Sequence, residues 1–300
     1  MPNPMALDIA VMTLPNQQWN ENTGEQDTAA AIAALEQGKI LYLPRLPFLL
    51  TAQESALLDP ALLEPNRKNI SYRPDGDRLD GVAVPEQRPA ARQLLERYHR
   101  SCLALLASLL PAYPAACHSP AGTLRLHQIA EWRARASWRK DDSRLHVDAF
   151  PSRPNRGERI LRIFTNINPF GISRTWRVGE PFPQLARRFL PRFKRYYPLA
   201  SWWLNAVGIT KTRRSRYDHL MLQLHDAMKS DPDYQRDGPQ RTMDFPPGST
   251  WICFSDQTPH AAMGGQFLLE QTFLLPVAAM RNPGLAPLNV LQSLVRAPLI

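Results

Sequence analysis

A histidine and a carboxylate two residues apart constrain this chain more than any other feature. They are His146 and Asp148, in the run 145–150, which follows a charged, turn-like segment and is typical of the end of a strand. On an extended strand both side chains point to the same face. With a later histidine they would form the 2-His-1-carboxylate triad that holds non-haem Fe(II) and leaves coordination positions open. The candidate third ligand is His260, in the run 255–260.

Strand-like segments surround both motifs. Residues 159–168 form the clearest strand of the sequence, ended by Pro169. Residues 248–254 and 266–276 form two more, on either side of His260. Strands before and after a long intervening segment, with helices mainly N-terminal, predict an α+β protein whose core is a double-stranded β-helix, or jelly roll. In that barrel the two histidine-bearing strands lie side by side at the mouth.

Helical patterns precede this core. The longest runs from 85 to 110, with apolar residues at helical spacing along one face. Shorter patterns cover 28–36 and 51–63, and the second begins with a capping box at Thr51. The 29 prolines outnumber the 14 glycines, which favours short elements and shaped loops elsewhere.

The chain divides into three predicted parts within one structural domain. Residues 1–122 are the helical and strand support, residues 123–281 the jelly-roll catalytic core, and residues 282–300 an apolar C-terminal docking segment. The core is expected to open with a strand over 123–132. Residues 171–240 within it are predicted to be a basic helical insertion.

The predicted insertion combines basic and aromatic residues. From Arg174 to Arg216 it carries eleven Lys and Arg against a single acid, Glu180. Basic side chains are attracted to anionic surfaces, and Trp and Tyr are typical anchors at a membrane interface. We therefore predict substrate or membrane contact through Arg187, Arg188, Arg192, Trp202 and Trp203. An ordinary solvated face is the alternative; nucleic-acid binding is not expected, because no recognised nucleic-acid motif is present.

Composition narrows the partners and the compartment. The net charge of +9 favours anionic substrates or an anionic membrane surface. The three cysteines show no Cys-x-x-Cys spacing, which argues for a reducing compartment and against a disulfide framework. No secretory signal is recognisable, and the uncharged stretch 101–124 is too rich in proline for a membrane span. We expect a cytoplasmic protein without a transmembrane segment.

The strand at 159–168 presents two different faces. Alternation places Arg159 on one face with apolar neighbours, and a polar set on the other. We expect the polar face to line the barrel interior; its members are Arg162, Phe164, Asn166 and Asn168.

An Fe(II) oxygenase of this kind usually needs a co-substrate that also occupies the metal. For 2-oxoglutarate, the distal carboxylate needs a buried base, and arginine suits it because it stays charged and can bind in a bidentate manner. The strand after the distal histidine, where such an arginine often lies, has none and carries Gln271 instead. We therefore predict Arg162 as the anchor, with Asn166 and Gln271 as further contacts. A salt bridge at the surface is the alternative for Arg162, and Arg159 is the next candidate.

Three runs of sequence carry a family resemblance. They are His-Val-Asp-Ala-Phe-Pro-Ser-Arg-Pro from His146, the strand Arg-Ile-Leu-Arg-Ile-Phe-Thr-Asn-Ile-Asn-Pro from Arg159, and Phe-Ser-Asp-Gln-Thr-Pro-His-Ala around His260. They resemble the 3-deoxy-D-manno-oct-2-ulosonic acid (Kdo) hydroxylases, a family of Fe(II)- and 2-oxoglutarate-dependent dioxygenases. The resemblance extends over most of the chain and is most specific in residues 123–276.

The resemblance implies an activity and its partners. The reaction would be O₂-dependent hydroxylation at carbon 3 of a Kdo sugar on Kdo₂-lipid A or a related glycolipid, giving Ko in lipopolysaccharide biosynthesis. His146, Asp148 and His260 would be the iron ligands. The protein would lie at the cytoplasmic face of the inner membrane. The residues leave two alternatives open: a metal-dependent hydrolase, in which zinc at the same triad activates water, and a non-catalytic jelly roll that binds anionic lipid.

Overall fold

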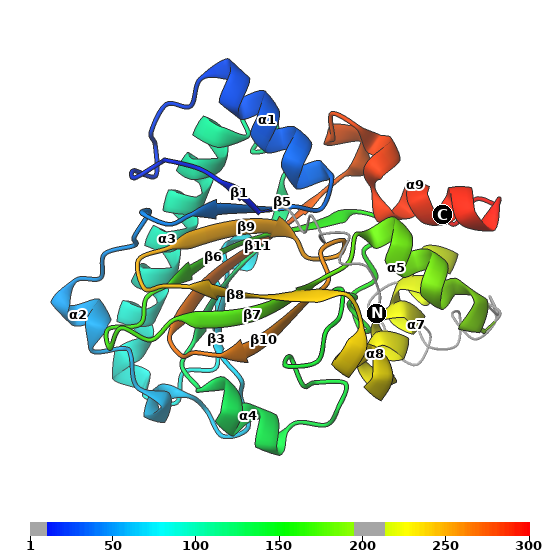
Figure 1. The fold of residues 1–300 in the computed structure, drawn as a ribbon. Coiled ribbons are helices and arrows are strands. Elements are labelled where there is room, and N and C mark those ends of the chain that lie inside the picture. Colours follow the sequence, from blue (N-terminus) through cyan, green and yellow to red (C-terminus); the bar gives the residue numbers. More distant parts are fainter. Residues whose placement is uncertain (1–10, 195–213) are drawn as a thin grey trace.

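Two facing β-sheets form the centre of the computed structural model, which describes residues 11–194 and 214–300 (Figure 1). The large sheet has eight strands in the order β1 (Val11–Thr13), β2 (Ile40–Leu43), β9 (Thr250–Phe254), β6 (Arg159–Asn166), β11 (Leu268–Leu275), β5 (His118–Arg125), β3 (Ile70–Arg73) and β4 (Arg78–Asp80). The small sheet has the order β10 (His260–Gly264), β7 (Arg174–Gly179) and β8 (Gln240–Phe245).

The strand connections are those of a double-stranded β-helix. Successive core strands alternate between the sheets: β6 lies in the large sheet, β7 and β8 in the small one, β9 in the large one and β10 in the small one. The pairs β9–β6, β6–β11 and β11–β5 are all antiparallel. An isolated bridge between His146 and His260 extends the small sheet past β10. The predicted α+β fold with a jelly-roll core is confirmed.

The side chains of strand β6 alternate between the two faces of the large sheet, as the sequence predicted. Leu161 and Ile163 pack into the core beneath α3 (Arg88–Leu109). Arg162 and Phe164 point the other way and line a cavity between the sheets. One face of the strand therefore supports the fold, and the other reaches the interior of the barrel.

Helices cover the outer face of the large sheet, with α3 and α1 (Glu25–Glu36) lying across it (Figure 1). One face of α3 is fully buried there, through Leu94, Leu95, Tyr98, Cys102, Leu105, Leu106 and Leu109. The helix predicted over 85–110 is thus confirmed to within a few residues at its start. In the described part of the chain, no helix is both long and apolar enough to cross a membrane.

The segment 171–240 differs from the predicted insertion. Its first strand, β7, lies between β10 and β8 and is the central strand of the small sheet, so it belongs to the barrel. The predicted basic run includes the arginines of β7, although this segment alternates as a strand does. Helical structure begins only after it, with α5 (Phe182–Phe189), α7 (Arg216–Ser230) and α8 (Pro232–Asp237). These helices share a second apolar cluster with α9 (Pro287–Val295).

Three further predictions need correction. The capping box at Thr51 is present, but α2 spans only Ala52–Ser55, and a 3₁₀ turn begins at Pro60. The proline cannot continue a helix that would have run to residue 63. The strand expected over 123–132 ends at Arg125, and α4 (Ile129–Arg135) follows, because residues 130–134 contain good helix formers. The segment 144–150 forms only the single bridge at His146.

A buried polar network holds the loop that precedes β10. Arg159 and Asp256 are both completely buried, and Arg159 Nε donates to Asp256 Oδ2 at 2.8 Å. Arg159 Nη2 also donates to Gln257 Oε1 at 2.6 Å, and Asp256 Oδ1 accepts from the backbone of Ile160 at 3.1 Å. Gln257 in turn donates to the carbonyl of Glu36 at 3.0 Å. Arg159 is therefore a structural residue on the far side of β6.

Removing one partner of this ion pair should strongly destabilise the fold. In Asp256→Ala the guanidinium of Arg159 would stay buried without a counter-charge, which costs about 3–5 kcal/mol. We expect the free energy of unfolding in urea to fall by that amount. Asp233→Ala is the matched control, because Asp233 pairs with Arg236 at the surface, where both side chains are exposed. Equal losses in the two variants would contradict the structural role given to Arg159.

Candidate metal centre

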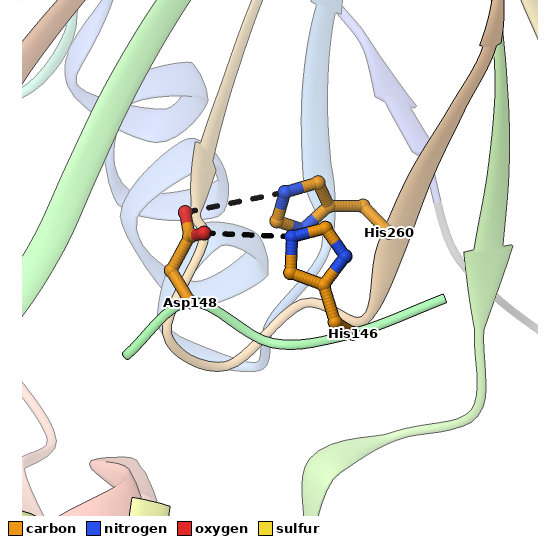
Figure 2. Close-up of side chains that lie close together, drawn as sticks. All are labelled: His146, Asp148 and His260. Carbon is orange, nitrogen blue, oxygen red and sulfur yellow. Dashed lines mark ion pairs between the residues drawn. The ribbon is translucent and has the colours of Figure 1, made fainter. Parts of the chain in front are cut away.

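Backbone pairing brings the two histidines together. The His146 N–H donates to the His260 carbonyl at 3.0 Å, and the His260 N–H donates to the His146 carbonyl at 2.8 Å. Two residues later the Asp148 N–H donates to the Ser255 carbonyl at 2.9 Å, which fixes the end of this segment. The three side chains therefore come from two segments that lie side by side (Figure 2).

The ligand atoms of the triad converge. His146 Nε2 lies 3.7 Å from Asp148 Oδ1, and His260 Nε2 lies 4.0 Å from Asp148 Oδ2 (Figure 2). One ligand atom from each residue falls within 4.8 Å of the others, and no other His, Cys, Asp or Glu group of the described residues does this. The predicted triad is thus assembled in space.

Each imidazole is held in the tautomer that a metal ligand needs. His146 Nδ1 lies 2.7 Å from the Arg144 carbonyl, and His260 Nδ1 lies 2.9 Å from the Thr258 carbonyl. Because a carbonyl can only accept, both Nδ1 atoms carry the proton, and both Nε2 lone pairs face Asp148. Histidines that bind metals typically donate their other N–H in this way.

The protonation states also suit a cation. Burial, followed by the charge of Lys229, lowers the pKa of His146 to about 3, and burial lowers the pKa of His260. Burial alone would raise the pKa of Asp148, but Arg162 and the two histidines together outweigh burial and hold that pKa well below its usual range. Two neutral imidazoles and one carboxylate therefore face one another. Asp148 Oδ2 is buried and accepts no hydrogen bond, and its nearest cation is the guanidinium of Arg162 at 3.3 Å.

A chain of alternating charges leads away from Asp148. Arg162 contacts Asp148 Oδ2 at 3.3 Å and Glu270 Oε1 at 3.2 Å. Arg125 contacts Glu270 Oε2 at 2.7 Å and Asp142 Oδ2 at 3.5 Å, and Asp142 also pairs with Lys68. Each carboxylate except Asp148 lies between two cations, and each arginine of the chain lies between two carboxylates. Their mutual attraction offsets the cost of burying these charges.

Arg174 differs from the arginines of this chain of charges, Arg125 and Arg162, because it has no acidic partner. It lines the cavity of about 200 Å³ beside the triad and is 3% exposed. Its Nη1 donates to the Gly265 carbonyl at 3.4 Å, its Nε has no hydrogen-bond partner, and it forms no ion pair with any described residue. Burial, followed by the charge of Arg125, lowers the pKa of Arg174 to about 9. The site thus contains a buried guanidinium whose charge is poorly compensated.

The predicted co-substrate residues lie in different places. Arg162 lines the cavity, as expected. Asn166 does not, because its amide donates to the carbonyls of Ile172 and Phe245 and its Oδ1 accepts from the backbone of Asn168, which ties the turn after β6. Gln271 shares the face of β11 with core residues beneath α3, whereas Glu270 faces the barrel. Strand parity therefore excludes Gln271 from the cavity.

The three predicted substrate and membrane contacts that the structure describes lie on α5 or just after it, and none of them lines the metal cavity. Arg187 is exposed. Arg188 pairs with Glu180 at 2.8 Å, and Arg192 pairs with Asp231 at 2.6 Å, so nearby carboxylates offset two of the three charges. Trp202 and Trp203 lie outside the described residues.

Sequence reasoning missed several residues of the cavity. Arg174 and Trp176 fall within the predicted basic segment, although their i, i+2 spacing on β7 indicates a shared face. Glu270 could have been found by the same alternation on β11. Lys68, Arg125 and Asp142 give no local signal, because only the pairing of distant segments brings them to the cavity.

The fold and site together define a class: jelly-roll proteins with a His-x-Asp and a distal histidine meeting at one metal position. The family model described as 3-deoxy-D-manno-oct-2-ulosonic acid (Kdo) hydroxylase matches residues 18–298. The chain therefore belongs to the Kdo hydroxylase family. A search of curated proteins gave no match.

Solved structures agree with this assignment. The chain resembles a crystal structure described as the Kdo hydroxylase KdoO, a non-heme Fe(II) α-ketoglutarate-dependent dioxygenase, in complex with α-ketoglutarate and Fe(III). The identity is 43% over 97% of both chains, with a TM-score of 0.91. The complex with succinate and Fe(III) is 42% identical over the same shares, with a TM-score of 0.92. The apo structure is 43% identical over the same shares, also with a TM-score of 0.92.

Proposed function

We propose that this protein is an Fe(II)- and 2-oxoglutarate-dependent hydroxylase that acts on a Kdo-containing acceptor. The observation that carries the proposal is the convergence of His146, Asp148 and His260 beside a cavity that holds an uncompensated arginine. Membership of the Kdo hydroxylase family supplies the acceptor class. A hydrolase at the same triad is disfavoured, because water activation alone gives no role to a buried anion-binding group beside the metal.

The three ligands would hold the iron through His146 Nε2, His260 Nε2 and one carboxylate oxygen of Asp148. When bound with 2-oxoglutarate and O₂, the iron supplies the oxidising chemistry that inserts oxygen into a C–H bond. The residues of this chain bind and orient the metal and the substrates, and they exclude water. Arg162 stays close to the second oxygen of Asp148, which favours a single metal bond from that carboxylate. Phe164 and Trp176 provide apolar wall that keeps bulk water from the cavity.

Arg174 is the residue we propose as the anchor of 2-oxoglutarate, in place of Arg162. A dicarboxylate that binds the metal at one end needs a cation at the other. Arg162 is already flanked by Asp148 and Glu270, so an added carboxylate would meet two negative charges there. Arg174 forms no such pairs with the described residues and keeps an unbonded Nε. It projects from the start of β7 into the same cavity.

Variants of the two arginines distinguish these roles. Arg174→Met should raise the KM for 2-oxoglutarate by roughly 30-fold or more, because removing one partner of a buried charge pair costs about 2–5 kcal/mol. Arg162→Met should instead weaken metal binding, because Asp148 would lose the guanidinium that keeps its buried carboxylate ionised, and a proton would then compete with the metal. Anaerobic titrations with Co(II) and steady-state kinetics over a range of 2-oxoglutarate concentrations measure both. If the KM for 2-oxoglutarate rises strongly in Arg162→Met and not in Arg174→Met, Arg162 is the anchor instead.

We further propose that the acceptor is lipid-linked, as in Kdo₂-lipid A hydroxylated at carbon 3 to give Ko, and that the protein works at the cytoplasmic face of the inner membrane. The net charge of +9 and the exposed Arg187 support attraction to an anionic surface. Each basic residue near such a surface contributes about 1 kcal/mol. Arg188 and Arg192 are paired with carboxylates, so each contributes less to the attraction toward an anionic membrane surface.

Vesicle binding tests the membrane proposal. The protein should co-sediment with vesicles that contain lipid A or other anionic lipids at 0.05 M salt, and dissociate near 1 M, where the Debye length falls to about 3 Å. Arg187→Glu should weaken binding, whereas Arg78→Glu, an exposed site on the edge strand β4, should not. Equal binding to neutral and anionic vesicles, without salt dependence, would contradict the electrostatic account.

A further inference from the structure

An ion pair spans the gap between the two sheets at the edge of the metal cavity. Lys68 lies two residues before β3 of the large sheet. Asp142 lies beside the small sheet, where its carbonyl accepts from the backbone N–H of Ala262 at 2.8 Å. Their side chains form an ion pair. Lys68 and Asp142 line both the metal cavity and a smaller recess beside α4.

The recess, at about 20 Å³, is too small for a sugar ring, but its aromatic side chains lie beside Lys68 at the edge of the larger metal cavity. The rings of His127 and Trp132 stack with centroids 5.8 Å apart, and Lys68 Nζ lies 6.0 Å from the centre of the Trp132 ring. Trp132 Nε1 is buried and has no hydrogen-bond partner, although buried indole N–H groups usually find one. An aromatic surface suits the apolar face of a sugar ring, and Lys68 suits its carboxylate.

The ionised groups around the metal cavity carry a net positive charge that one further anion would neutralise. Lys68, Arg125, Arg162 and Arg174 line it, against the carboxylates of Asp142 and Asp148 and that of Glu270, which pairs with two of these arginines. A divalent metal and the dianion of 2-oxoglutarate cancel each other. One positive charge then remains in a largely buried space, which favours an acceptor that carries a single carboxylate.

We propose that Lys68 binds the carboxylate of the acceptor sugar, and that Asp142 holds Lys68 until the acceptor arrives. This inference rests on the proposed function. Lys68 is the terminal member of the charge chain, so its release leaves Asp142 beside Arg125 at 3.5 Å. The exchange therefore leaves every carboxylate of the chain near a cation. Lys68 also keeps a side chain that is 26% exposed, against 12% for Arg162, so it is the more accessible of the two.

The test compares a lipid-linked Kdo glycoside with its methyl ester, in which the carboxylate has lost its charge. In the wild type the ester should have a KM roughly 10- to 100-fold higher, the range expected for the loss of a hydrogen bond to a charged group. Lys68→Gln should raise the KM of the acid to that of the ester and abolish the discrimination. Lys68→Arg should retain it. Arg67→Gln is the matched control, because Arg67 is exposed and pairs with Glu64 away from the cavity.

A second variant separates recognition from a structural role. Asp142→Asn removes the competitor for Lys68, so the KM of the acid should fall while that of the ester changes little. A KM for the acid that rises in both Asp142→Asn and Lys68→Gln would mean that the pair only braces the two sheets, and would overturn the inference. Discrimination that survives in Lys68→Gln would do the same. If the wild type hydroxylates neither compound, the proposed function itself fails.

Discussion

The reciprocal backbone pairing of His146 with His260 is the constraint on which the site depends. It brings together two segments more than a hundred residues apart and places both imidazoles on one side of the small sheet. Each ring then donates Nδ1–H to the carbonyl two residues before it, at Arg144 or Thr258. This hydrogen bond is present at both histidines, and it directs both Nε2 atoms toward Asp148. The buried pair of Arg159 and Asp256 holds the loop that delivers His260, so the far side of β6 supports the chemistry on its near side.

Charge compensation explains how so many ionised groups share one interior. From Asp148 to Lys68, cations and carboxylates alternate through Arg162, Glu270, Arg125 and Asp142, so no member of the chain lacks an opposite neighbour. Against that background an uncompensated group is informative. Arg174 is buried without an anionic partner among the described residues and lines the cavity beside the triad, and for this reason we propose it as the anchor of the co-substrate. A charge that is costly without its ligand is an expected property of a binding site.

Much of this site could be predicted from local sequence, and the rest could not. Strand parity correctly placed Arg162 and Phe164 inside the barrel, and the His-x-Asp spacing with a distal histidine found the three residues that converge. The same parity, applied to β11, would have excluded Gln271 and found Glu270. Alternation alone would place Asn166 among the cavity residues. Its side chain instead forms hydrogen bonds within the turn after β6. The ion pairs of Lys68 and Arg125 depend on the register between distant strands, and one sequence contains no local signal for register.

The central claim is that His146, Asp148 and His260 hold an Fe(II) that 2-oxoglutarate also binds. The visible absorption spectrum on anaerobic addition of Fe(II) and 2-oxoglutarate tests it most directly, because chelation of the metal by the oxo acid gives a weak charge-transfer band. The account predicts this band in the wild type and its loss in His260→Ala, with the variant still folded by circular dichroism. A wild type without the band, or a His260→Ala variant with the full band and full iron content, would contradict the account.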